Sequence, residues 1–94
     1  MLSIRYNGTD SEHTLVCEGH AGNVESGKNI ICAAASIIII TLAEVIEEEI
    51  ASNDYGYSEI SCARSEKNDA AFEFALCGLG LLAEHHPEEV HIEK

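Results

Sequence analysis

An apolar run over residues 30–43, interrupted only by Ser36 and Thr41, constrains the fold of this chain more than any other feature. The run is too short to cross a bilayer as a helix, which takes about 20 apolar residues. We therefore expect a core helix over residues 30–51 that packs on a sheet. Its sheet-facing side is predicted to comprise Ile38, Leu42, Val45 and Ile46. Further apolar residues widen this face, so the helix should also contact a second helix or a partner subunit.

Alternating patterns elsewhere predict a small sheet. Strands are expected over residues 1–7, 13–20, 55–65 and 89–93, with a tight turn at Asn7-Gly8 between the first two. A second helix is expected over 70–84, after a turn at 66–69 whose Asn68 or Asp69 would cap it. The predicted fold is a single α+β domain over residues 1–94, in the order ββαβαβ, with both helices on one face of the sheet.

The second predicted helix carries an apolar stripe and two glycines. The stripe comprises Phe72, Leu76, Leu79 and Ala83. Gly78 and Gly80 weaken the helix but allow a neighbouring helix to approach closely.

The charge balance limits the classes of partner. The chain has 17 acidic and 5 basic residues, and its formal net charge is −12. Such a surface repels phosphates, so direct binding of nucleic acid is not expected. A basic protein or peptide is the complementary partner, although an acidic surface also serves solubility alone.

The four cysteines are expected to be reduced thiols. They are Cys17, Cys32, Cys62 and Cys77. The first residues lack the long apolar segment of a signal peptide, which favours a cytoplasmic location over a disulfide-forming compartment. A cysteine within an apolar helix is usually a small buried residue, and we expect this of Cys77.

Cys32 has a different setting, because it would lie in the first turn of the predicted core helix. Asn29 is a suitable N-cap, and the positive end of the helix dipole favours the thiolate of Cys32. His20 precedes a loop with Gly22 and Gly27 and could accept the thiol proton. Backbone N–H groups of the same turn could stabilise an oxyanion. From the residue pattern alone, the alternative that Cys32 is an ordinary buried core cysteine is equally well supported.

Other chemistries find less support in the sequence. Cys17 and His20, with His13 and Cys32 nearby, could form a zinc site, but no second pair completes four ligands. There is no Cys-x-x-Cys motif and no phosphate-binding loop with its Lys-Ser/Thr pair. We therefore predict no metal and no cofactor.

The segments Gly19-His20-Ala21-Gly22 and Gly27-Lys28-Asn29-Ile30-Ile31-Cys32-Ala33-Ala34, followed by Ser36, closely resemble the ribosomal-processing cysteine protease family, Prp. The resemblance extends over the whole chain. It implies that His20 and Cys32 form a catalytic dyad in a small homodimer of the bacterial cytoplasm. It also implies a substrate, a large-subunit ribosomal protein whose short N-terminal extension is removed.

The chain departs from the family pattern at one position, where Asn29 replaces the usual Asp. Asn can cap the helix but brings no negative charge to an imidazolium. Around the dyad we assign substrate binding to Gly19, Ala21, Gly22, Gly27, Asn29 and Ser36. The competing hypothesis is a non-enzymatic acidic module that binds a basic ribosomal protein through residues such as Glu47, Glu48, Glu49 and Glu84.

Overall fold

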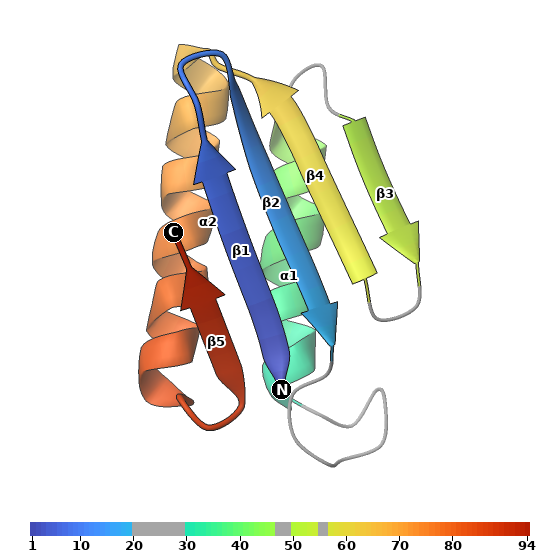
Figure 1. Ribbon diagram of the computed structural model, residues 1–94, viewed down its shortest axis with the longest axis vertical. Coiled ribbons are helices and arrows are strands. Elements are labelled where there is room, and N and C mark those ends of the chain that lie inside the picture. The colour runs from blue at the N-terminus through green and yellow to red at the C-terminus, as the bar shows by residue number, and fades with distance from the viewer. Residues whose placement is uncertain (20–29, 47–49, 55–56) are drawn as a thin grey trace.

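The computed structural model describes residues 1–19, 30–46, 50–54 and 57–94, and of 50–54 it describes the backbone alone. Two helices cover one face of a five-stranded sheet, whose strand order is β3-β4-β2-β1-β5 (Figure 1). The strands are β1 (Leu2–Gly8), β2 (Glu12–Gly19), β3 (Ile50–Asp54), β4 (Tyr57–Ala63) and β5 (Val90–Glu93). The helices are α1 (Ile30–Val45) and α2 (Glu66–His85). The predicted α+β class, with both helices on one face, is confirmed.

The β1–β2 hairpin forms the centre of the sheet. Gly8 pairs with His13 across the turn, and Ile4 pairs with Cys17. The turn predicted at Asn7-Gly8 is continued by Thr9, whose N–H donates to the Glu12 carbonyl at 2.9 Å. β5 joins β1 in parallel, whereas the other strand pairs are antiparallel. Alternation sends one side chain in two toward the helices, where the core lies.

α1 packs on the sheet through Ala35, Ile39 and Leu42, all buried. Ile46, one residue past the helix, is also buried as predicted. Two expectations about this helix are wrong. Val45 is 42% exposed, and the helix ends at Val45 rather than at residue 51. The apolar spacing continues past Val45 with Ile46, but residues 50–54 belong to strand β3 instead of extending the helix.

β3 is an additional strand beyond the predicted order. Its residues were expected to end the first helix, yet they pair antiparallel with β4, with Ala51 opposite Ile60. The pairing places β3 at the edge of the sheet (Figure 1). Short-range periodicity does not reveal such a strand, because its hydrogen bonds are made to a neighbour that follows it in the chain.

α2 begins earlier than its apolar pattern predicts. Ser65 is the N-cap, and its hydroxyl accepts a hydrogen bond from the Asn68 N–H at 3.0 Å. Residues 66–69, expected as a turn, therefore form the first turn of the helix. Asn68 is buried there, and its side-chain amide donates to the Ala63 carbonyl at 3.0 Å. This bond ties the start of α2 to the end of β4.

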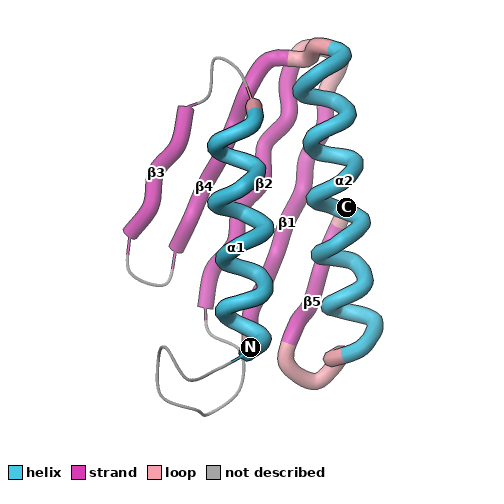
Figure 2. Tube along the Cα trace, turned by 180° about the vertical axis from the view of Figure 1, so that it is seen from behind, coloured by secondary structure: helices cyan, strands magenta, loops and turns pink. Residues whose placement is uncertain are grey.

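The two helices lie side by side over the sheet (Figure 2). A Cβ added at Gly78 would stand 3.3 Å from Ile38 Cδ1, so the glycine permits the close approach that the sequence predicts. Gly80 instead faces Lys94. Cys77 is exposed, which contradicts its expected burial, because it lies on the side of α2 opposite Phe72 and Leu79. None of the helices described here has the length and apolarity needed to cross a membrane.

Candidate active site

The end of β2 and the start of α1 lie at the same end of the molecule (Figures 1 and 2). Gly19 is the last residue of β2, and Ile30 is the first of α1. The predicted site residues His20, Ala21, Gly22, Gly27 and Asn29 fall between them and lie outside the described residues. The topology therefore brings the two flanks of the Gly-His and Cys motifs together.

Cys32 occupies the first turn of α1, as the sequence predicts. It is half-buried and packs against the hydrophobic core. The first turn carries no acidic residue, so no carboxylate there opposes a negative charge on the thiol. The first N–H groups of an α-helix lack partners within the helix and point toward its N-terminus. Negative charge on a bound group at this end of the helix, such as an oxyanion, is favoured by the helix dipole.

Cys17, on the neighbouring strand, is electrostatically coupled to Cys32. The Cys17 side chain is buried, and this burial, together with the charges of Cys32 and Glu18, raises the pKa of its thiol to about 11. Cys17 therefore stays a neutral thiol at physiological pH. Cys17 therefore adds no negative charge beside Cys32.

Gly19 has a backbone conformation that requires glycine. Its φ is +92°, in the left-handed region, and a Cβ at this position would collide with the carbonyl oxygen of Met1. The backbone of Met1 therefore approaches Gly19 closely. A role of Gly19 in binding substrate stays a prediction.

Ser36 lies one turn after Cys32 on the same side of α1, and it is exposed. The side chain of Ile38, by contrast, packs toward α2 at Gly78. The side of α1 that carries Cys32 and Ser36 thus faces away from α2. A role of Ser36 in binding substrate stays a prediction.

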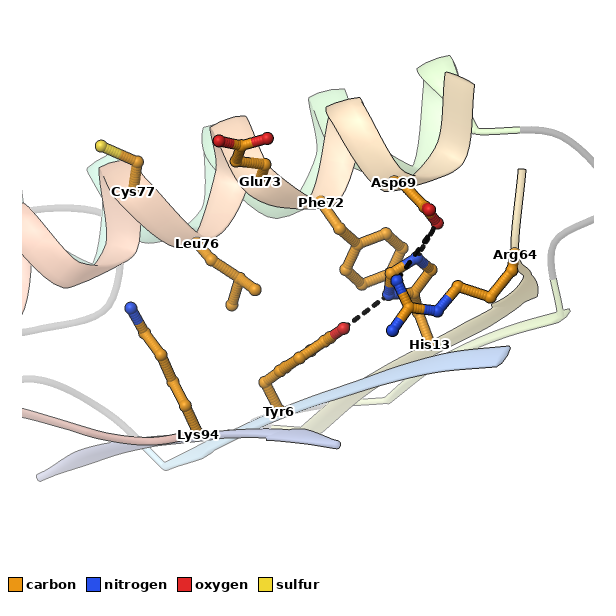
Figure 3. Close-up of a pocket in the computed structure, with 9 residues that line it drawn as sticks. All are labelled: Tyr6, His13, Arg64, Asp69, Phe72, Glu73, Leu76, Cys77 and Lys94. Atoms are coloured by element: carbon orange, nitrogen blue, oxygen red, sulfur yellow. Dashed lines mark hydrogen bonds and ion pairs between the residues drawn. The ribbon is translucent and has the colours of Figure 1, made fainter. Parts of the chain in front are cut away.

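A second cluster of polar side chains lies at the other end of β2 (Figure 3). His13 is 2% exposed, and both of its ring nitrogens are engaged. The Tyr6 hydroxyl lies 2.6 Å from Nδ1, and Asp69 Oδ1 lies 2.6 Å from Nε2. Because an ionised carboxylate only accepts, Nε2–H donates to Asp69, and the Tyr6 hydroxyl shares the second hydrogen bond with Nδ1.

Neighbouring groups hold this cluster in place. The His13 ring stacks on Phe72, with centroids 4.4 Å apart and planes 7° from parallel. The hydrogen bond from His13 and the charge of Arg64, whose Nη1 lies 3.5 Å away, lower the pKa of Asp69 below its usual 3.8. Arg64 Nε in turn donates to the Thr9 carbonyl at 2.9 Å. The cluster therefore joins the hairpin turn, β4 and α2.

The sequence did not predict the Tyr6–His13–Asp69 cluster. His13 was considered only as a possible zinc ligand, and its nitrogens are instead bound to Tyr6 and Asp69. Over the described part of the chain, no group of three or more His, Cys, Asp or Glu side chains is arranged to hold a metal ion. One signal was available, since alternation places His13 on the same face of β2 as the buried Leu15 and Cys17. A histidine on that face needs polar partners.

Comparison with known proteins extends over almost the whole chain. The family model described as cysteine protease Prp matches residues 1–91. No curated protein matches. Among solved structures, the chain is similar to the essential ribosomal processing protease Prp from S. aureus with a covalently linked product peptide, with a TM-score of 0.82. The sequence identity is 19%, and the match covers 99% of this chain and 98% of the other.

Two further structures have the same fold. The same S. aureus protease in complex with a substrate peptide matches with a TM-score of 0.74 at 20% identity, over 99% of this chain and 98% of the other. SMU.848 from Streptococcus mutans matches with a TM-score of 0.70 at 28% identity, over 99% of this chain and 92% of the other.

Proposed function

The chain belongs to the cysteine protease Prp family, and from this premise we propose that it removes the short N-terminal extension of a large-subunit ribosomal protein with a His20/Cys32 dyad. The observation that carries the proposal is the position of Cys32 in the first turn of α1, beside the end of β2. The Gly-His-Ala-Gly motif continues directly from that strand end. The S. aureus structures with peptides support a peptide substrate for this fold.

The first half of the proposed reaction forms an acyl-enzyme. His20 takes the proton of the Cys32 thiol, and the thiolate sulfur attacks the carbonyl carbon of the scissile peptide bond. Negative charge moves to the carbonyl oxygen, where first-turn N–H groups of α1 stabilise it. The intermediate then collapses to a thioester on Cys32. The C–N bond breaks, and the amine leaves with the proton from His20.

The second half restores the enzyme. His20 accepts a proton from water, and the resulting hydroxide attacks the thioester carbonyl. The same N–H groups hold the second oxyanion. Cys32 leaves as the thiolate, and the carboxylate product carries the removed extension. Neutral Cys17 supports both halves, because it adds no competing negative charge beside the nucleophile.

The acidic surface suits a basic substrate. With a net charge of −12, the chain attracts a positively charged ribosomal protein and repels RNA phosphates. We place the activity in a bacterial cytoplasm, where such a substrate is made. The specific cut would come from the peptide-binding residues near the dyad, because long-range attraction increases the rate of encounter without selecting a peptide bond.

A homodimer is part of the same proposal. Large apolar side chains project from the outer faces of both helices, and Phe74 is 82% exposed and Ile37 60% exposed. Ile30 and Leu81 extend this outer apolar face along α1 and α2. A second copy of the chain would cover it. Phe74→Glu should then shift the sedimentation coefficient from that of a dimer to that of a monomer, while a dimer that persists would contradict this interface.

The cleavage activity is tested with a ribosomal-protein substrate that carries its N-terminal extension. The native protein, Cys32→Ala and the matched control Cys77→Ser are each incubated with it, and mass spectrometry reads product and cut site together. Cys77 is an exposed cysteine on the other helix, so its removal changes the thiol count but not the proposed site. We expect cleavage by the native protein and by Cys77→Ser, and none by Cys32→Ala.

Two results would overturn the assignment. Undiminished cleavage by Cys32→Ala would exclude Cys32 as the nucleophile. Binding of the ribosomal protein by the native chain without any cleavage, unchanged in Cys32→Ala and His20→Ala, would favour an acidic binding module instead.

A further inference from the structure

A cavity opens between α2 and the strands β1 and β5 (Figure 3). Its volume is about 540 Å³. Small-molecule sites in proteins span roughly 300–1,000 Å³, so the cavity is of suitable size. Neither Cys32 nor Cys17 lines it. It therefore does not belong to the candidate active site.

One wall of the cavity is aromatic and apolar. The rings of Tyr6 and Phe72 lie 5.9 Å apart between centroids, and Leu76 projects from α2 toward Tyr6 (Figure 3). His13 keeps Tyr6 in place through the hydrogen bond to its hydroxyl. Gly8 is also required, because a Cβ there would collide with the Tyr6 hydroxyl. The wall is thus held rigidly by several elements, as a binding surface for an apolar group needs to be.

The cavity is also lined by two cations with unused hydrogen-bonding capacity. Lys94 extends from the end of β5 into the cavity toward Leu76, and Nζ has no ion pair or hydrogen bond to any residue that the structure describes (Figure 3). Arg64 uses Nε on the Thr9 carbonyl and Nη1 on Asp69, which leaves further N–H donors. The chain has only 5 basic residues, and this one cavity contains two of them.

The acidic residues of the lining do not cancel these donors. Asp69 is already bound to His13 and Arg64. The Glu73 carboxylate points away from Tyr6 and Leu76, toward the outer side of α2 (Figure 3). The groups left to face a ligand are therefore hydrogen-bond donors with positive charge, next to an apolar wall. Such a set calls for a ligand with an acceptor at one end and an apolar body.

We propose that this cavity binds a small organic carboxylate with an apolar body, such as an aryl-substituted short-chain acid. The carboxylate binds Lys94 Nζ, and the apolar body packs against Leu76, Phe72 and the ring of Tyr6. Arg64 closes the opposite end of the cavity. The site is non-covalent and makes no use of Cys32, so it is independent of the proposed protease activity.

The test is an NMR titration of the full chain with 4-phenylbutyrate, with the uncharged 4-phenylbutyramide as the matched probe. We expect saturable shifts at Leu76 and His13 with the carboxylate and much weaker ones with the amide. Lys94→Gln should weaken the carboxylate Kd about tenfold, the effect of losing one charged contact. Lys67→Gln is the matched control, because it also removes one lysine charge, but on α2 and outside the cavity lining. It should leave the Kd unchanged.

Three results would overturn the proposal. The first is the absence of saturable shifts at Leu76 and His13 with millimolar carboxylate. The second is equal binding of the amide, which would show that no charged group selects the ligand. The third is an equal loss of affinity in Lys94→Gln and Lys67→Gln, which would reduce the effect to general electrostatics. Cleavage of a ribosomal-protein substrate is measured separately, so a failure here leaves the dyad assignment intact.

Discussion

Two clusters of ionisable side chains lie near the two ends of β2, and these clusters are built in opposite ways. At the start of the strand, His13 is buried, and both ring nitrogens and one ring face are occupied by Tyr6, Asp69 and Phe72. At the other end, Cys32 is half-buried at a helix N-terminus, next to a cysteine that remains neutral. The first arrangement fixes its residues through side-chain contacts, whereas the second places a thiol in the first turn of a helix, beside a neutral neighbour.

The largest expected effect is the loss of cleavage activity when His20, the proposed base, is replaced. His20→Ala removes the proposed base and should lower kcat/KM for the ribosomal-protein substrate by about 10²–10⁴-fold, because the thiol loses its proton acceptor. His91→Ala, an exposed histidine of β5, is the matched control and should cleave normally. Steady-state kinetics measures both. Full activity in His20→Ala would remove the histidine from the dyad.

His13→Ala should have the opposite effect to His20→Ala, because it should lower stability and leave the cleavage rate unchanged. It removes two hydrogen bonds and a stacked ring from the interior, so unfolding should require about 2–4 kcal/mol less free energy. Urea denaturation measures the change, and the part of the protein that remains folded should keep its cleavage rate. A His13→Ala variant of native stability that has lost activity would reverse the roles assigned to the two ends.

Two glycines test whether the backbone at the end of β2 is as constrained as its φ implies. Gly19→Ala should destabilise the fold by about 1–3 kcal/mol, since an L-residue is strained at this φ and its Cβ meets Met1. Gly80→Ala, in the interior of α2, should stabilise by about 0.5–1 kcal/mol, because alanine is the better helix former. Urea midpoints of the two variants should therefore move in opposite directions. A shift in the same direction would contradict the strain at Gly19.

A smaller effect than the loss of His20 or His13 concerns Cys17 at alkaline pH. The thiol has a folded-state pKa of about 11 against an ordinary value of 9.0, so its contribution to stability is complete below pH 9 and is lost as the pH rises toward 11. The native chain should lose about 1 kcal/mol of stability by about pH 10 from this group. Cys17→Ala should lack that part of the decline. Identical pH dependence in the two proteins would exclude a buried, neutral thiol.

The stability at acidic pH depends on Asp69, which contacts His13 at the opposite end of β2. Asp69 has a lowered pKa, so the stability it contributes is complete above its usual 3.8 and is lost as the pH falls through the lower folded value. Asp69→Asn should flatten the acid side of the stability profile, measured by urea denaturation at several pH values. The same slope in both proteins would show that the His13 bond does not favour the charged carboxylate.

Local patterns account for most of the fold but not for its long-range contacts. Alternation predicts β1 and β2, and apolar spacing predicts α1, because a buried residue recurs at fixed intervals in each. The end of α1 and the strand β3 depend on pairing with β4, which comes later in the chain. The start of α2 depends on one hydroxyl, that of Ser65, and its apolar stripe gives no sign of it.

The candidate site and the His13 cluster also differ in whether local sequence or long-range contacts determine them. Cys32 could be placed in a first helical turn from the apolar run that follows it, and its site needs only neighbouring segments. The His13 cluster could not be predicted, since Asp69 follows 56 residues later and meets His13 only after α2 packs on the hairpin. The cavity beside it depends on the parallel pairing of β5 with β1, which brings Lys94, the residue after β5, near Tyr6 of β1. Local spacing does not encode this pairing.

The most direct test of the central claim is the relative rate at which iodoacetamide labels Cys32 and Cys77 in the folded native protein. Cys77 is exposed and Cys32 is half-buried, so access alone favours Cys77. Mass spectrometry of peptides from a time course gives both rates in one sample. If Cys32 is the activated nucleophile, it is labelled faster than Cys77 near neutral pH despite its lower exposure. Labelling that follows exposure, with Cys77 first, would contradict the account.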